Sequence, residues 1–120
     1  MEEYKPGNTI ENLRDSIKGE TYESQEMYPG FLKDTKSERF EDYAKVARLS
    51  IRWAQEVEET HAEVLQKALN VLEAGGKFEA EVIYVCRFCG NLVLELPEKV
   101  CPVCKHDKRF YEKVERPEDN

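Results

Sequence analysis

The sequence is short of three things: long apolar runs, positive charge, and cysteine outside its last third. No stretch approaches the roughly 20 apolar residues that span a bilayer, and the first eight residues, MEEYKPGN, are polar where a signal peptide needs an apolar core. A net charge of −7, from 18 Lys and Arg against 25 Asp and Glu, argues against nucleic-acid binding. We therefore expect a cytoplasmic protein with neither a membrane nor a nucleic-acid partner.

The four cysteines form two close pairs, Cys86 with Cys89 and Cys101 with Cys104. In a reducing compartment such pairs indicate metal ligation and not a disulfide framework. The pattern is C-x-x-C-G, ten intervening residues, then C-P-x-C, and four thiolates on two such turns form a tetrahedral cage. The spacing fits a structural zinc ribbon as well as an iron site, so both metals stay open at this point.

Residues 9–75 are highly charged and helix-forming. Asn8, with Glu11 three positions on, predicts a helix start of the capping-box type. Pro29 predicts a kink or a local loosening, because proline cannot donate the backbone hydrogen bond of a regular helix. A turn near residues 39–41 would divide the region into the two helices of a hairpin.

After two glycines that end the helical region, the sequence changes to short β-type runs at residues 82–85 and 92–94. We expect the tail beyond Val114 to be disordered. The chain is accordingly divided into two domains, a helical one at residues 1–76 and a four-cysteine one at residues 77–120. We expect these two domains to be structurally separate.

Two rows of mainly apolar residues, at alternating steps of three and four, run along the helical region, as in helices packed at about 20° in a bundle. The first row consists of Ile10, Leu13, Ile17, Glu20, Ser24, Met27 and Phe31. The second row consists of Phe40, Tyr43, Ala44, Ala47, Ile51, Ala54, Val57, Glu58, His61, Val64, Leu65, Ala68, Val71 and Leu72. A single hairpin would leave one side of each row in water, so a partner hairpin is implied, most simply a second copy of the chain.

Ionisable residues interrupt both rows at one depth. Glu20 lies in the first row with Glu23 beside it, and Glu58 and His61 lie three apart in the second. A buried carboxylate is costly unless it is paired or bound to a metal. The alternative is a solvent-facing set of helical glutamates, which is common for a Glu-x-x-His string taken alone.

The ordered motifs of the chain resemble the rubrerythrin family over residues 8–114. The helical motifs are ENL at residues 11–13, GETYE at residues 19–23, EMYP at residues 26–29 and EETHAE at residues 58–63. The cysteine motifs CRFCG and CPVC are similar to the rubredoxin-type domain of that family and stand in the same order.

The resemblance implies a peroxidase that reduces hydrogen peroxide at a diiron site, with electrons delivered by a donor protein through a mononuclear iron–tetrathiolate site. The implied catalytic and metal-binding residues of the bundle are Glu20 and Glu58 as ligands or bridges, His61 as a terminal ligand, and Glu23 as a carboxylate that adjusts with charge. The implied ligands of the second iron are the four cysteines. Zinc stays possible at either site.

The chain departs from the family pattern by having two bundle helices in place of four. Two copies would restore the ligand count, with a diiron site shared between chains. The expected fold is therefore mainly α: a ferritin-like helical hairpin that forms a four-helix bundle by dimerisation, plus a small rubredoxin-like metal-knuckle domain. Two other functions stay open, namely ferritin-like iron oxidation or storage, and a zinc-ribbon interaction protein without catalysis.

Overall fold

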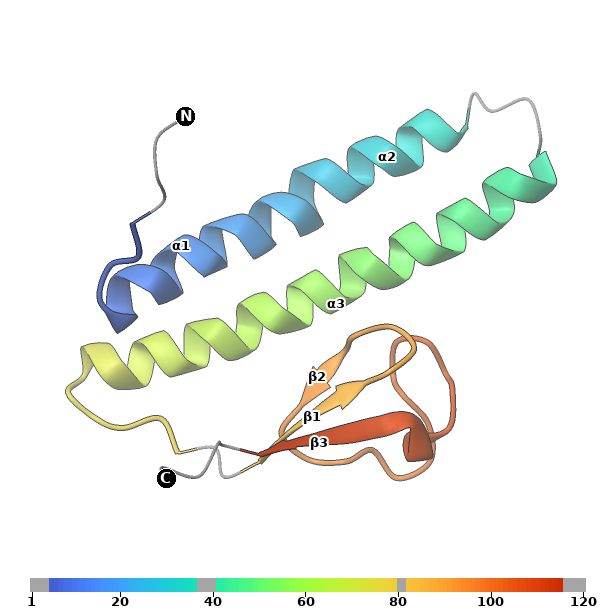
Figure 1. Ribbon diagram of the computed structural model, residues 1–120. Helices are drawn as coiled ribbons and strands as arrows, with labels where there is room; N and C mark the ends of the chain where they lie inside the picture. Colours follow the sequence, from blue (N-terminus) through green and yellow to red (C-terminus); the bar gives the residue numbers. More distant parts are fainter. Residues whose placement is uncertain (1–4, 37–40, 80–81, 116–120) are drawn as a thin grey trace.

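The computed structural model describes residues 5–36, 41–79 and 82–115. Its architecture is a long helical hairpin with a small three-stranded sheet packed beneath it (Figure 1). Within the described residues, no helix is both long and apolar enough to cross a membrane.

The first arm of the hairpin begins with α1, Thr9–Tyr22. The Asn8 side chain accepts a hydrogen bond from the Glu11 backbone N–H at 2.9 Å, which satisfies one of the amide groups left unpaired at a helix start. The predicted helix start is therefore confirmed.

The loosening expected at Pro29 takes the form of a π-helical turn, Glu23–Met27, which is followed by α2, Tyr28–Thr35. A π turn accommodates an additional residue, so it rotates all later side chains around the helix axis. Phe31 of the predicted row is 46% exposed in the single chain, whereas Thr35, one turn further on the same face, is buried.

The second arm is α3, Glu41–Glu73, which runs antiparallel to α1 and α2 (Figure 1). It ends in a Schellman motif: the Gly76 N–H bonds the Val71 carbonyl at 2.9 Å and the Gly75 N–H bonds the Leu72 carbonyl at 3.0 Å. Gly75 has φ of +82°, a conformation that side-chain-bearing residues rarely adopt. The predicted helix stop is thereby explained.

The hairpin buries few side chains completely. Ala44, Val57, Ala68 and Leu69 are buried on α3, whereas α1 has no fully buried residue. Five large apolar side chains of the arms are exposed: Tyr22, Phe31, Tyr43, Val46 and Leu49. Residues 37–40 lie outside the described part of the chain. They include Phe40 and most of the predicted hairpin apex at residues 39–41.

The four-cysteine part contains β1, Val82–Cys86, β2, Leu92–Val93, and β3, Tyr111–Glu115, in the antiparallel order β2-β1-β3. The first two strands confirm the predicted β runs. The third strand was not predicted, and it includes Glu115, which we had assigned to a disordered tail. The rest of that tail lies outside the described residues.

The four-cysteine part packs on the side of α3 that faces away from α1 and α2 (Figure 1). Trp53 of α3 packs against the cluster of cysteines, and Val57 lies beside Gly90 of the first knuckle. The two predicted domains are therefore in contact. Of the two contact residues, Trp53 lies outside the predicted apolar rows, whereas Val57 belongs to the second row.

Candidate metal centres

The sulfurs of Cys86, Cys89, Cys101 and Cys104 converge, all within 4.8 Å of one another. Two of the Sγ–Sγ separations, Cys86 to Cys104 and Cys89 to Cys101, are 3.7 Å. A tetrahedral site with metal–sulfur bonds of about 2.3 Å has sulfur–sulfur edges of about 3.8 Å. The four thiols, none of them in a disulfide, therefore match the dimensions of a tetrathiolate site.

Two similar turns shape this thiol cage. The Gly90 N–H bonds the Cys86 carbonyl at 2.8 Å, and the Lys105 N–H bonds the Cys101 carbonyl at 3.0 Å. Gly90 has φ of +84° and Lys105 has φ of +65°. Glycine adopts this conformation without strain, which explains the glycine after the first cysteine pair.

The thiols differ in how readily they ionise. Burial by itself raises the pKa of Cys101, but hydrogen bonds from the Tyr111 hydroxyl and from the backbone amides of Cys104 and Val103 outweigh it and lower the pKa to about 7. Burial raises the pKa of Cys89 well above its ordinary value. Because a metal binds thiolates, loading the cage releases protons.

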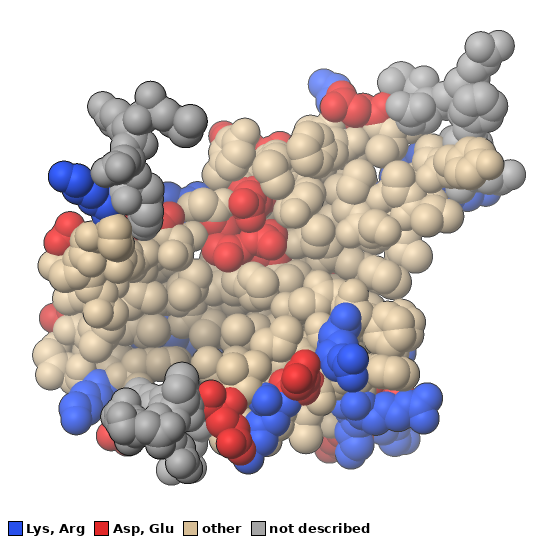
Figure 2. All heavy atoms as spheres, in the orientation of Figure 1, with Lys and Arg blue, Asp and Glu red and all other residues tan. Residues whose placement is uncertain are grey.

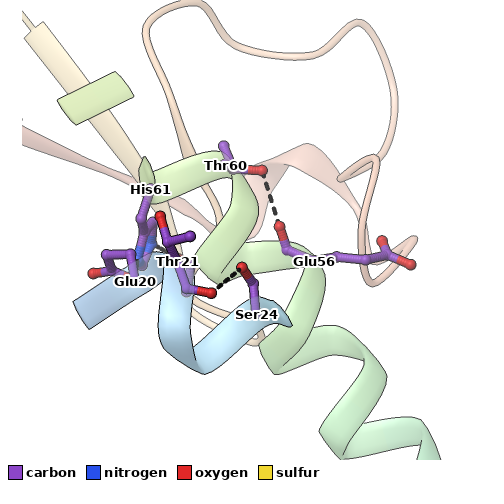
Figure 3. A network of polar contacts seen from close by, with 7 residues as sticks. Glu20, Thr21, Ser24, Glu56, Thr60 and His61 are labelled. Atoms are coloured by element: carbon purple, nitrogen blue, oxygen red, sulfur yellow. Dashed lines mark hydrogen bonds and ion pairs between the residues drawn. The ribbon is translucent and has the colours of Figure 1, made fainter. Parts of the chain in front are cut away.

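The second group of possible ligands joins the two arms of the hairpin. Glu20 of α1 and Glu58 and His61 of α3 offer ligand atoms within 4.8 Å of one another. Glu20 and His61 point toward each other, whereas Glu56 points away on the other side of α3 (Figure 3). Acidic side chains also gather near the middle of the hairpin on the face shown in Figure 2. The predicted common depth of these residues is thus observed.

The hydrogen bonding of His61 favours a cation between these side chains. Its Nε2 lies 2.9 Å from the Gly90 carbonyl oxygen, which can only accept, so Nε2 donates and Nδ1 is the ring nitrogen left for a metal. Nδ1 is 3.5 Å from Glu20 Oε2, and this buried oxygen has no hydrogen-bond partner. A ring nitrogen and a carboxylate oxygen at this distance could bind one metal ion together.

Glu23 lies outside this three-residue group. It is half-buried and begins the π-helical turn, one turn beyond Glu20. Ser24, which the sequence places in the same row, is buried and donates its hydroxyl proton to the Thr21 carbonyl at 3.2 Å (Figure 3). The structure therefore brings together three of the four predicted bundle residues.

Three side chains near the thiol cage make contacts that the sequence did not predict. The Tyr111 hydroxyl is 3.2 Å from Cys101 Sγ, and Asn91 Nδ2 is 3.1 Å from that hydroxyl. The His106 ring stacks on the Phe88 ring, with ring centroids 3.9 Å apart. No local motif marks these residues, because each contact depends on how the second knuckle and β3 close over the first knuckle.

A helical hairpin with a carboxylate–imidazole group, joined to a four-thiolate sheet domain, defines a non-haem metal protein with two different metal centres. A family model described as Rubrerythrin matches residues 2–69, more than half of the sequence. The chain belongs to the rubrerythrin family. Each of the two groups of side chains could hold a metal ion.

Similar proteins support this membership over most of the chain. A rubrerythrin-type protein of Methanocaldococcus jannaschii is 39% identical over 110 residues, which is 88% of this chain and 52% of that protein. The rubrerythrin of Porphyromonas gingivalis is 33% identical over 109 residues, again 88% of this chain and 52% of the relative. The chain therefore spans about half the length of the curated relatives that it matches.

The fold is similar to that of a solved structure of fully reduced, all-ferrous nigerythrin. The TM-score is 0.77 at 24% identity, and the match covers 95% of this chain and 53% of the other. The helical hairpin and the four-cysteine domain are thus found in one structure of known fold, which confirms the predicted fold class apart from dimerisation.

Proposed function

We propose that this chain is a rubrerythrin-type peroxidase, which reduces hydrogen peroxide at a diiron site with electrons received through an iron–tetrathiolate site. The bundle ligands would be Glu20, Glu58 and His61, with Glu23 as an additional carboxylate. Bound iron would supply the redox chemistry, with one-electron transfer at the cysteines and two-electron reduction of the peroxide O–O bond at the carboxylates.

The observation that carries the proposal is the position of His61 between the two centres. Its Nδ1 faces Glu20, while its Nε2–H donates to Gly90, the residue directly after Cys89. One hydrogen bond and a few covalent bonds therefore separate a bundle ligand from a thiolate ligand. A structural zinc ribbon or an iron-storage bundle has no need of such a connection.

His61 and Glu23 would also determine how the ligands adjust when the charge of the bound metals changes. The Gly90 carbonyl fixes the orientation of the His61 ring, with Nδ1 toward Glu20, as hydrogen-bonded partners of metal-binding histidines do. Glu23 begins the π-helical turn, where the backbone is less constrained than in an α-helix. We infer that this turn lets the Glu23 carboxylate move toward or away from the metals as their charge changes.

The proposal includes a homodimer in which two hairpins form one four-helix bundle. Each chain supplies half of the bundle helices of the family, and Phe31 of the first apolar row, 46% exposed, would be covered by a second hairpin. A second copy would contribute its own Glu20, Glu58 and His61 to a shared site. The free thiols of the cage support a reducing, cytoplasmic location, where a reduced donor protein would supply electrons.

The function is tested with protein purified without oxygen from iron-replete cells. Metal analysis should give iron at both sites, the protein should be red when oxidised, and peroxide should be consumed with a chemical or protein reductant. Glu58→Ala and His61→Ala should abolish turnover and bundle iron while the red colour persists. Glu56→Ala, on the opposite side of α3, is the matched control. Unchanged turnover in both ligand variants, or a colourless protein with stoichiometric zinc, would contradict the proposal.

The shared site is tested by sedimentation at micromolar concentration. Phe31→Glu, in the first apolar row, should convert the dimer to a monomer that keeps its red colour but loses bundle iron, since a buried charge opposes association. Val114→Glu, at a residue of β3 that is 50% exposed, should leave the dimer intact. An iron-loaded, active monomer would sink the dimer while leaving the peroxidase proposal standing.

A further inference from the structure

A chain of three buried side chains ends on one sulfur of the thiol cage. Asn91, Tyr111 and Cys101 are 1%, 9% and 0% exposed. Asn91 Nδ2 is 3.1 Å from the Tyr111 hydroxyl oxygen, and that oxygen is 3.2 Å from Cys101 Sγ. The three residues come from the loop before β2, from the start of β3 and from the second knuckle, so the folded domain assembles this contact.

The direction of these hydrogen bonds follows from the donors available. An amide nitrogen only donates, so the Tyr111 oxygen accepts from Asn91 and its single proton is free for another acceptor. Cys101, once it is a metal-bound thiolate, can only accept. The hydroxyl proton therefore points to the sulfur, and Asn91 both orients the hydroxyl and makes it a stronger donor.

A proton donor at a ligand sulfur affects the two oxidation states of bound iron differently. Reduction of an iron–tetrathiolate site adds one electron and therefore one negative charge, which is shared with the sulfurs. A hydrogen bond to sulfur stabilises the more negative, reduced state more strongly, and so raises the reduction potential. The burial of all three side chains removes competing water, which strengthens the effect.

We propose that Tyr111, held in place by Asn91, raises the reduction potential of iron at the four cysteines by donating a hydrogen bond to Cys101. This role rests on the proposed function only in requiring iron at the cysteine site. Tyr111 is a positioning and tuning residue, because it contacts a ligand sulfur and neither the metal nor peroxide. Its effect is to keep this iron reduced, and therefore ready to donate, at potentials where an untuned site would be oxidised.

The test is a potentiometric titration of the full chain loaded with iron, followed through the visible absorption that is lost on reduction. For Tyr111→Phe we expect the ratio of reduced to oxidised iron at a fixed potential to fall roughly tenfold, which is about 59 mV for a one-electron couple. Tyr84→Phe is the matched control, since Tyr84 lies in the same sheet and its hydroxyl has no described contact with a sulfur.

A double-substitution cycle separates tuning from packing. Asn91→Leu alone should lower the potential by less than Tyr111→Phe does, and it should have no further effect when Tyr111 is already Phe. Melting of the zinc-loaded variants confirms that each domain is folded. An unchanged potential in a folded, iron-loaded Tyr111→Phe protein would overturn the inference. A site that takes up only zinc would overturn it together with the electron-transfer part of the proposed function, and metal analysis distinguishes the two results.

Discussion

Replacing Glu20 with glutamine should stabilise the protein when the bundle holds no metal. It should also abolish the gain in stability that the unsubstituted protein shows when metal binds in the bundle. Glu20 and Glu58 offer oxygens within 4.8 Å of each other, and Glu20 Oε2 is buried without a hydrogen-bond partner. The glutamine amide keeps the shape of the side chain and removes one of the two negative charges.

The magnitude follows from the separation of the carboxylates. Two unit charges at most 4.8 Å apart repel by at least about 3.5 kcal/mol at an effective dielectric constant of about 20. Because the Glu20 side chain is 23% exposed, solvent screening reduces the repulsion, and we take about 1.5 kcal/mol. The metal-free variant should therefore melt roughly 6 °C above the unsubstituted protein.

The assay is calorimetry at pH 8, where an imidazole is ordinarily neutral, with one equivalent of zinc supplied to fill the thiolate cage. Manganese is then added as a carboxylate-preferring ion that is not oxidised readily. A hundredfold excess over the dissociation constant should stabilise the unsubstituted protein by about 2.7 kcal/mol and leave Glu20→Gln nearly unchanged. Glu56→Gln, whose side chain points away from the group (Figure 3), should behave as the unsubstituted protein in both states. If Glu20→Gln lowers the metal-free melting temperature, or keeps the full response to manganese, the reasoning fails.

Two further predictions concern the cysteine domain and the helix end. Cys101→Ser should abolish the red colour and also weaken metal binding in the bundle by roughly 10- to 100-fold, measured by titration with manganese; equal affinities would contradict a link through Gly90. Gly75→Ala should lower the free energy of unfolding by about 1 kcal/mol, because φ of +82° strains any side chain. Gly30→Ala, inside α2 with no atom within 4 Å of the added carbon, should raise it by about 0.5–1 kcal/mol; equal denaturation midpoints for these two variants would contradict the assignment of the helix end.

The parts of the fold that the sequence predicted are those encoded by local signals. A cap needs only Asn8 and a nearby amide, and a helix stop needs only a glycine at the required dihedral angle. The paired cysteines define their cage because each knuckle is a short turn within one segment. Glu20 and His61 could be matched across the hairpin because helices of constant rise place equal numbers of residues at equal depth.

The remaining features depend on changes of phase or on distant contacts. A π-helical turn before Pro29 shifts the periodicity by one residue, and no regular pattern contains that shift. The strand that begins at Tyr111 is charged and mostly exposed, so its sequence alternates too weakly to be recognised. The partner of His61 Nε2 is a backbone carbonyl at Gly90, and a carbonyl is present at every position, so its identity carries no signal.

The hydrogen bond between His61 and Gly90 also gives a physical reason for the two domains to lie in contact. The Gly90 carbonyl belongs to the first knuckle, in which the Gly90 N–H bonds the Cys86 carbonyl at 2.8 Å. Metal at Cys86 and Cys89 would hold this knuckle in place, and the knuckle in turn orients the His61 ring, as hydrogen-bonded partners of metal-binding histidines do. We therefore expect metal at the thiolate site to strengthen metal binding between Glu20, Glu58 and His61, which is the coupling that Cys101→Ser tests.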